Sequence, residues 1–135
     1  MQLEIFKEII AKMQEHDAII DKTYDAGIDL TNLMDPIQNV VSHLIGSIYG
    51  EEGKDTFDWW CFDNEYGTRD LEMTDKEGNR LCRNIEDLYI YLEANKTDDY
   101  SLPIKLTDEE RLKILKGFFK IMLITLSYFI FFFGE

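Results

Sequence analysis

The sequence predicts a mainly α-helical protein of about five helices, with one small β-hairpin at about residues 71–82 between the third and fourth helices. Apolar side chains recur at intervals of three and four residues over long stretches, which is the spacing of one helix face. Residues that begin or end helices, such as Asp35-Pro36 and Gly67, divide these stretches. The segment at about 71–82 differs, because Asp75-Lys76-Glu77-Gly78 is a turn sequence between two short runs that favour strands.

The first helix is expected from about residue 2 to 26, with Gly27 as its C-terminal stop. Its apolar stripe alternates steps of three and four residues and is interrupted only at Asp17. The second helix is expected to begin at Asp35 as the N-cap, with Pro36 in the first turn, and to end at Gly50. The stripe of the first helix comprises Leu3, Phe6, Ile10, Met13, Ile20 and Tyr24.

The third helix is expected over about residues 52–65, where an acidic first turn suits the positive end of the helix dipole. Asn84 is the expected N-cap of the fourth helix, and Thr107 forms a capping box with Glu110 that opens the last one. Between them the chain has the composition of a linker. We therefore divide the sequence into an acidic helical body with the hairpin (1–94), a linker (95–106) and a C-terminal apolar helix (107–135), packed on the body or used as an anchor.

Length and charge exclude several classes of function. The 135 residues provide a single domain, too short for a cofactor domain and a substrate domain together. The net charge of −13 argues against direct binding to nucleic acid, because phosphates are neutralised by clustered Lys and Arg. The apolar content of 45% argues against a disordered acidic tail. Two cysteines, Cys61 and Cys82, and an N-terminus without a signal-peptide core favour a reducing cytoplasm.

The C-terminal segment of residues 118–133 is largely apolar, and Lys120 is its only charged residue. Three interpretations stay open. The segment is a core helix surrounded by the other helices, the usual position of a helix that is apolar on all sides. It is an interface between copies of the chain, which suits its aromatic content. Or it is a membrane tail anchor, which requires Lys120 to extend to the membrane surface.

An acidic stripe runs along the first helix, where Asp17, Asp21 and Asp25 follow at intervals of four residues. Like charges at this spacing destabilise a helix by about 0.2–0.5 kcal/mol per pair. A solvated face that keeps the protein soluble is one interpretation. The other is a surface for a basic partner that imitates a row of phosphates.

The third helix carries aromatic residues on two faces. Phe57, Trp60 and Cys61 share one face, and Trp59 and Phe62 lie on another with Tyr66, about 100° further round at 3.6 residues per turn. We favour burial on both sides, beneath the hairpin.

The second aromatic face also has functional interpretations. It could meet a partner, with Trp59, Asp63 and Glu65 among the contacts. It could instead hold a small anionic ligand stacked on Trp59, with the nearby arginines binding its charge. Those arginines are Arg69, Arg80 and Arg83.

This region resembles small acidic proteins of phages and prophages. The resemblance covers about residues 37–93 and lies in the aromatic helix Trp59-Trp60-Cys61-Phe62, the step Glu65-Tyr66-Gly67, and the flanking runs of residues 48–53 and 85–89. It implies a phage accessory protein that acts by binding and blocking a host protein. It assigns no role to any single residue.

No enzymatic chemistry stands out in the sequence. His16 and His43 lie on different predicted helices without a second ligand at metal-binding spacing, so we expect no metal and no cofactor. His16 is expected to pack beside the apolar stripe. Carboxylate pairs are expected by chance among 27 acidic residues, and no phosphate-binding loop or nucleophile motif is present. We therefore expect that the protein is not an enzyme.

Together these observations predict a non-enzymatic accessory or inhibitor protein, encoded by a phage and acting in the cytoplasm of its host bacterium. Its acidic and aromatic surface would engage a basic host protein, and anti-defence activity or nucleic-acid mimicry is the most specific form of this hypothesis. A membrane-attached protein, tail-anchored by residues 118–133, is the alternative, and a small anionic-ligand binder is the third. A homo-oligomer is compatible with each.

Overall fold

The computed structural model describes residues 1–67, 77, 84–100, 107 and 109–120, and confirms a mainly helical protein with five helices. They are α1 (Leu3–Asp25), α2 (Met34–Tyr49), α3 (Glu51–Asp63), α4 (Ile85–Ala94) and a helix over residues 109–120, with 3₁₀ turns η1 (Thr31–Leu33) and η2 (Glu65–Gly67). These residues contain no strand. The expected hairpin at about 71–82 lies outside them except for Glu77 and has no support.

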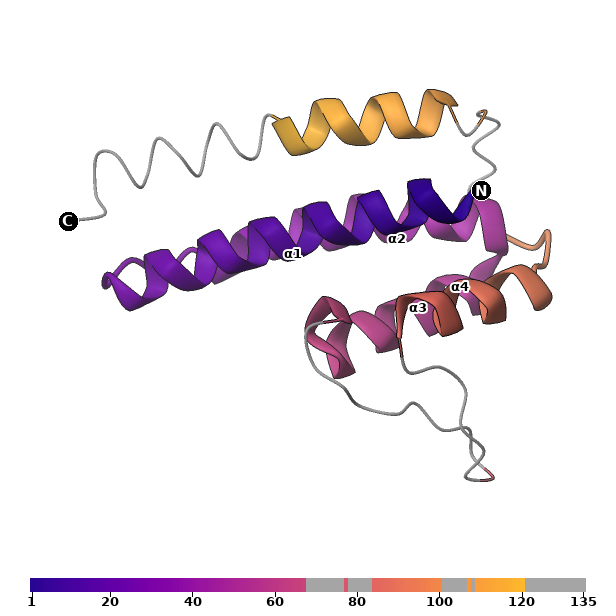
Figure 1. Cartoon of the computed structure of the whole chain (residues 1–135), viewed down its shortest axis with the longest axis horizontal. Coiled ribbons are helices and arrows are strands. Elements are labelled where there is room, and N and C mark those ends of the chain that lie inside the picture. The colour runs from indigo at the N-terminus through magenta and orange to yellow at the C-terminus, as the bar shows by residue number, and fades with distance from the viewer. Residues whose placement is uncertain (68–76, 78–83, 101–106, 108, 121–135) are drawn as a thin grey trace.

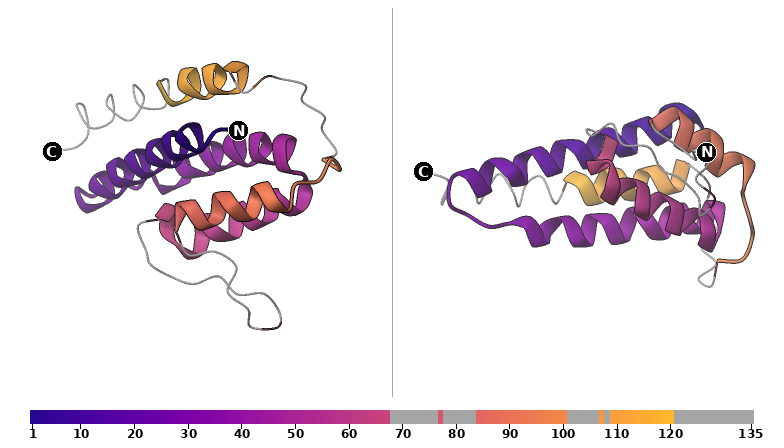
Figure 2. Two further views of the ribbon diagram at one scale, coloured as in Figure 1. Left: turned by 45° about the vertical axis from the view of Figure 1, so that its right-hand side comes forward. Right: turned by 90° about the horizontal axis from the view of Figure 1, so that it is seen from below.

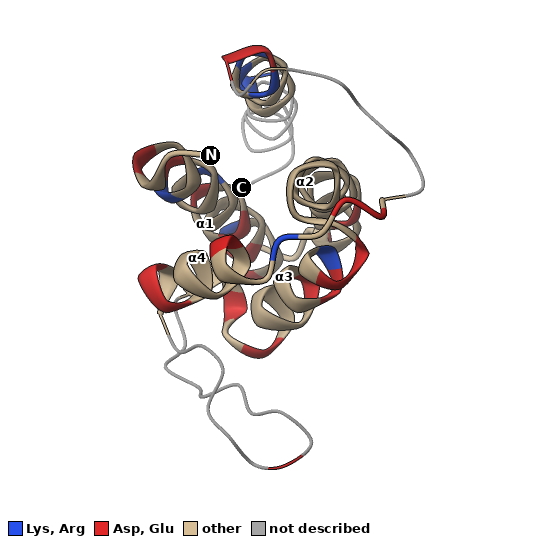
Figure 3. Cartoon of the chain, turned by 90° about the vertical axis from the view of Figure 1, so that its right-hand side faces the viewer, with Lys and Arg blue, Asp and Glu red and all other residues tan. Residues whose placement is uncertain are grey.

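The helices form three layers (Figure 1). α1 and α2 lie side by side and antiparallel in the middle layer, as the view from below shows (Figure 2). α3 and α4 cover one face of this pair, and the helix of residues 109–120 lies over the opposite face (Figure 3). The middle pair is therefore covered on both faces.

The core lies between the layers and is built from the apolar faces of all five helices. In α1 the predicted stripe is buried from Phe6 to Ile20, whereas Tyr24 near the end of the helix is exposed. The remaining layers contribute Ile37, Val41 and Ile45 of α2, Phe57 and Trp60 of α3, Leu88 and Leu92 of α4, and Leu115 and Phe119 of the last helix.

Two of the three predicted helix N-caps are present in the structure. Oδ1 of Asn84 accepts a hydrogen bond from the backbone N–H of Asp87 at 2.8 Å, which confirms the N-cap of α4. Thr107 Oγ1 accepts from the N–H of Glu110 at 3.2 Å, and Glu110 Oε1 accepts from the N–H of Thr107 at 3.2 Å, which confirms the capping box.

The predicted cap at Asp35 is wrong. The turn η1 runs directly into α2, so the residue before the helix, Leu33, already has helical dihedrals (φ −73°, ψ −16°). The helix therefore begins at Met34 without a side-chain cap, and Asp35 lies inside its first turn.

The joint between α2 and α3 depends on Gly50, which has φ +94° and lies against the segment after α4. The backbone N–H of Thr97 donates to the carbonyl oxygen of Tyr49 at 3.0 Å. Oδ1 of Asp99 accepts from the N–H of Glu51 at 3.1 Å, so a carboxylate from a distant segment supports the first turn of α3.

Candidate partner-binding surface

Two large aromatic side chains of α3 are exposed. Trp59 is 64% and Phe62 82% exposed, whereas Phe57, Trp60 and Cys61 are buried against the other helices. The division into two faces is as predicted, but burial on both sides is wrong for Trp59 and Phe62. Within residues 1–67, 84–100 and 109–120, the other helices bury the Phe57 face of α3 and leave Trp59 and Phe62 exposed.

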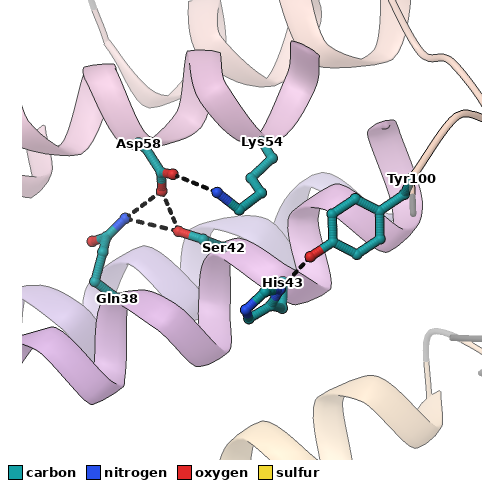
Figure 4. A network of polar contacts seen from close by, with 6 residues as sticks. All are labelled: Gln38, Ser42, His43, Lys54, Asp58 and Tyr100. Carbon is teal, nitrogen blue, oxygen red and sulfur yellow. Dashed lines mark hydrogen bonds and ion pairs between the residues drawn. The ribbon is translucent and has the colours of Figure 1, made fainter. Parts of the chain in front are cut away.

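A hollow of about 330 Å³ lies on the exposed side of α3, lined by Asp55, Asp58, Trp59 and Phe62. Asp58 is occupied by structural contacts (Figure 4). Its Oδ1 accepts from Gln38 Nε2 at 2.9 Å and from Ser42 Oγ, and its Oδ2 lies 3.1 Å from Lys54 Nζ. These bonds join α2 to α3 and raise the pKa of Lys54, chiefly through the hydrogen bond to Asp58.

A second hollow, of about 310 Å³, is shared by α1 and the end of α3. It is lined by Asp17, Asp21, Cys61, Phe62, Glu65 and Tyr66. Phe62 borders both hollows, so the two are neighbours on one surface. We call the lining of both hollows the acidic–aromatic surface.

The turn that carries Glu65 and Tyr66 has an unusual backbone. Both residues have positive φ (48° and 60°), and Gly67 follows with φ +91°. A residue other than glycine in this region costs roughly 1–3 kcal/mol and persists only where its surroundings fix it. Gln14 of α1 contributes to this, because its Nε2 donates to the carbonyl oxygen of Tyr66 at 2.7 Å. The strained turn thereby holds Glu65 beside the acidic stripe of α1.

The carboxylates of this hollow repel one another. Partial burial raises the pKa of Asp17, and repulsion from Asp21 and then from Glu65 raises it further. Burial likewise raises the pKa of the Tyr66 phenol, with a contribution from Asp17. Among the described residues, no Lys or Arg lines either hollow. The acidic–aromatic surface therefore concentrates negative charge beside exposed apolar area, and a cation placed there would relieve the repulsion.

The structure brings together four of the six residues predicted to bind a partner. Asp17, Asp21 and Glu65 line one hollow and Trp59 the other, whereas Asp25 and Asp63 line neither. Of the predicted anionic-ligand site, only Trp59 lies among the described residues. The remaining members, Arg69, Arg80 and Arg83, fall outside them.

Sequence reasoning did not name five residues of this surface as site residues: Asp55, Asp58, Cys61, Phe62 and Tyr66. Two of these were recognisable, because Asp55 and Phe62 lie four residues before and three after Trp59 and so share its helix face. Helical periodicity also placed Tyr66 on the face of Trp59 and Phe62, but Tyr66 reaches the surface through the positive-φ turn after α3 has ended.

The histidine of α1 and the cysteine of α3 are both buried in the fold. His16 is 1% exposed, with Nδ1 2.8 Å from the carbonyl oxygen of Lys12 and Nε2 3.2 Å from that of Phe119. Cys61 is a buried free thiol whose pKa burial raises, so it is protected from reaction. Cys82, the second cysteine of the chain, lies outside the described residues. In the part of the chain that the structure describes, no group of His, Cys, Asp or Glu is arranged to hold a metal ion.

Only the beginning of the C-terminal segment of residues 118–133 is described. Phe119 is buried and Phe118 is partly buried against the core, so this part packs on the body. None of the helices in residues 1–67, 84–100 and 109–120 combines the length and hydropathy needed to cross a membrane. The position of residues 121–133 lies outside the described residues.

No protein family, curated protein or solved structure matches this chain. Its function is therefore inferred from the residues of the acidic–aromatic surface.

Proposed function

We propose that this protein is a non-enzymatic accessory or inhibitor protein that binds a basic region of another protein through its acidic–aromatic surface. One observation carries the proposal: Asp17, Asp21 and Glu65 surround a hollow, and exposed Phe62 joins it to the hollow beside Trp59. Aromatic residues supply much of the binding energy in interfaces. The flanking carboxylates favour a positively charged partner and increase its rate of association.

Charge complementarity favours a basic partner over a second copy of this chain. Two copies docked by this surface would bring like charges together, which costs free energy in a partly desolvated interface. A Lys or Arg side chain would instead enter the hollow beside Asp17, where burial and repulsion raise the pKa of the carboxyl. The alkyl stem or guanidinium of that side chain would pack against Phe62.

In its most specific form, the proposal names a nucleic-acid-binding protein of a bacterial host as the partner and a phage as the source of the inhibitor. Proteins that bind nucleic acids present clustered Lys and Arg. The carboxylates of α1 repeat about every 6 Å, from four times the helical rise. Phosphates of one duplex strand repeat every ~3.4 Å, so the acidic stripe would engage a few cations rather than follow a whole DNA-binding groove.

A displayed library of random peptides tests this proposal without a known partner. Peptides selected on the full-length protein should be enriched in Lys and Arg next to an apolar anchor. Phe62→Ala should weaken their binding by more than about tenfold, the size of an interface hot spot. Because Phe62 is exposed, this substitution should leave the thermal unfolding midpoint nearly unchanged.

Ile90→Ala is the matched control, because Ile90 is a similarly exposed apolar residue (63%) on α4. Asp21→Asn and Asp25→Asn form a second pair, since both remove one charge from α1 but only Asp21 lines a hollow. Selected peptides without basic residues, or equal losses from Phe62→Ala and Ile90→Ala, would refute the proposal.

A further inference from the structure

A hollow of opposite character lies between α1 and the helix of residues 109–120. Its volume is about 320 Å³, which is within the range of small-ligand sites, roughly 300–1,000 Å³. The helix of residues 109–120, which borders this hollow, lies over the face of the α1–α2 layer away from α3 and α4 (Figures 1 and 3). The hollow is lined by Glu8, Lys12, His16, Lys116, Phe119 and Lys120.

Packing fixes the position of the helix of residues 109–120 against α1. Leu115 and Phe119 are buried against α1, and the Phe119 ring lies 5.1 Å from the His16 ring, centroid to centroid. His16 Nε2 lies 3.2 Å from the carbonyl oxygen of Phe119. Because these contacts hold the last helix in register with α1, the cations of the two helices face the same hollow.

Positive charge predominates here, although the chain as a whole has a net charge of −13. Three ammonium groups and one carboxylate line the hollow among the residues that the structure describes. The carboxylate of Glu8 lies 3.5 Å from Lys116 Nζ, and Glu15, outside the lining, lies 3.4 Å from Lys12 Nζ. Within the described part of the chain, Lys120 pairs with no carboxylate.

The two existing ion pairs do not close the site to an anion. Both involve side chains that are 41% to 58% exposed. Exposed pairs of this kind contribute only about 0.2–1 kcal/mol, so a more highly charged anion can replace them. Lys ammonium groups bind phosphate as point charges and do not require the planar geometry of arginine.

We propose that this hollow binds a phosphate group through Lys12, Lys116 and Lys120. The charge balance fits this ligand. The described part of the lining carries three positive charges against the one negative charge of Glu8, and a phosphomonoester carries about −1.5 to −2 at neutral pH. A single carboxylate would leave positive charge uncompensated. The buried ring of Phe119 gives the hollow an apolar side, against which the carbon skeleton of an organic phosphate packs.

The phosphate group has two chemical sources, a soluble organic phosphate and the headgroup of an anionic phospholipid. Residues 121–134, which follow Lys120 in the sequence, contain no Asp, Glu, Lys or Arg, so the last described cation precedes an apolar run. Either source uses the same three ammonium groups. The experiment distinguishes them by using one probe for each.

Full-length protein is titrated with glycerol phosphate by calorimetry and is sedimented with vesicles of phosphatidylcholine that contain phosphatidic acid, whose headgroup is a phosphomonoester, or with vesicles of phosphatidylcholine alone. Lys120→Gln should weaken binding of the responding probe by about tenfold, as expected for loss of one charge-assisted contact. This variant breaks no ion pair among the described residues, so the fold should be retained, which circular dichroism checks.

Lys113→Gln is the matched control, because it removes the same charge from the same helix but Lys113 does not line the hollow. Binding of glycerol phosphate that is lost with Lys120→Gln and kept with Lys113→Gln supports a soluble ligand. The same pattern with vesicles that contain phosphatidic acid, and not with glycerol phosphate, supports a lipid headgroup. Binding to neither probe, or equal losses from the two variants, overturns the proposal.

Discussion

Asp17 illustrates at the residue scale how a break in a pattern can mark a site. It interrupts the apolar stripe of α1, and the sequence also placed it in the acidic stripe with Asp21 and Asp25. In the fold, Asp17 is partly buried and meets Glu65 from a turn 48 positions away in the sequence. That proximity could not be predicted, because it depends on the positive φ angles of Glu65 and Tyr66.

Replacement of Asp17 should stabilise the protein at neutral pH. Burial and repulsion raise the pKa of this carboxyl above its ordinary value of 3.8. A raised acid pKa means that the folded state binds the proton more tightly, so stability falls as the pH rises from that value through the folded pKa. Asp17→Asn removes this cost. Urea unfolding at pH 7 should show a gain of less than about 1 kcal/mol, because the group is half-exposed and screened.

The same gain should vanish as the pH falls below 3.8, where Asp17 is protonated in both states. Glu65→Gln and Asp63→Asn provide the control for the tertiary contact. NMR titration of Asp17 should give a lower pKa in the Glu65 variant, because repulsion from Glu65 contributes to the shift, and the same pKa in the Asp63 variant. A gain in stability that does not depend on pH would show that the raised pKa of Asp17 is not its cause.

At the element scale, local sequence was a good guide to helices and a poor guide to their junctions. α1 and α4 begin and end within a residue or two of the prediction, because apolar periodicity and caps act within a few residues. The start of α3, at Glu51, also lies within one residue of the prediction, but its support comes from distant residues. Asp99 accepts a hydrogen bond from the first turn of α3, and Gly50, at the junction with α2, packs against Thr97. Neither contact is visible to apolar periodicity or capping patterns, which act over a few residues.

Gly50→Ala tests this junction. A Cβ at residue 50 would lie 1.9 Å from Oγ1 of Thr97 and 2.6 Å from Oδ1 of Asp99, and φ is +94°. The positive φ alone costs an alanine about 1–2 kcal/mol. Chemical denaturation should therefore show a loss of at least that size, and hydrogen exchange should show faster opening of the first turn of α3.

Gly117→Ala is the opposite control, because no atom lies within 4 Å of a Cβ built there. This glycine lies inside a helix, where alanine is favoured by roughly 0.5–1 kcal/mol. The two glycine variants should therefore change stability with opposite signs. An unchanged stability of the Gly50 variant would contradict the packing of Thr97 and Asp99 on this junction.

At the scale of the whole molecule, charge is divided between two faces. Residues 1–100 carry 23 acidic and 9 basic side chains, whereas residues 101–135 carry 4 and 5. α1 contributes to both faces, with Asp17 and Asp21 in the acidic–aromatic surface and Lys12 in the cationic hollow. The two proposed sites would thus attract ligands of opposite charge to opposite sides of the α1–α2 layer.

Salt should stabilise this protein. With a net charge of −13, the folded state concentrates like charges, and screening reduces this repulsion. The screening length shrinks from about 30 Å at 0.01 M to about 3 Å at 1 M salt. The thermal unfolding midpoint should therefore rise with sodium chloride and equally with potassium chloride, and Asp17→Asn should reduce the slope. A midpoint that falls with salt would mean that attractive ion pairs outweigh the repulsion.

The sequence by itself determined the helical class, most helix boundaries, the buried stripe of α1 and the acidic character of the body, because these depend on residue spacing and composition. Tertiary structure decided which side chains meet. It exposed Phe62 while burying Trp60, placed Glu65 beside Asp17, and brought Lys120 towards Lys12. Each of these outcomes depends on how helices pack and turns bend between segments far apart in the chain, which no local pattern specifies.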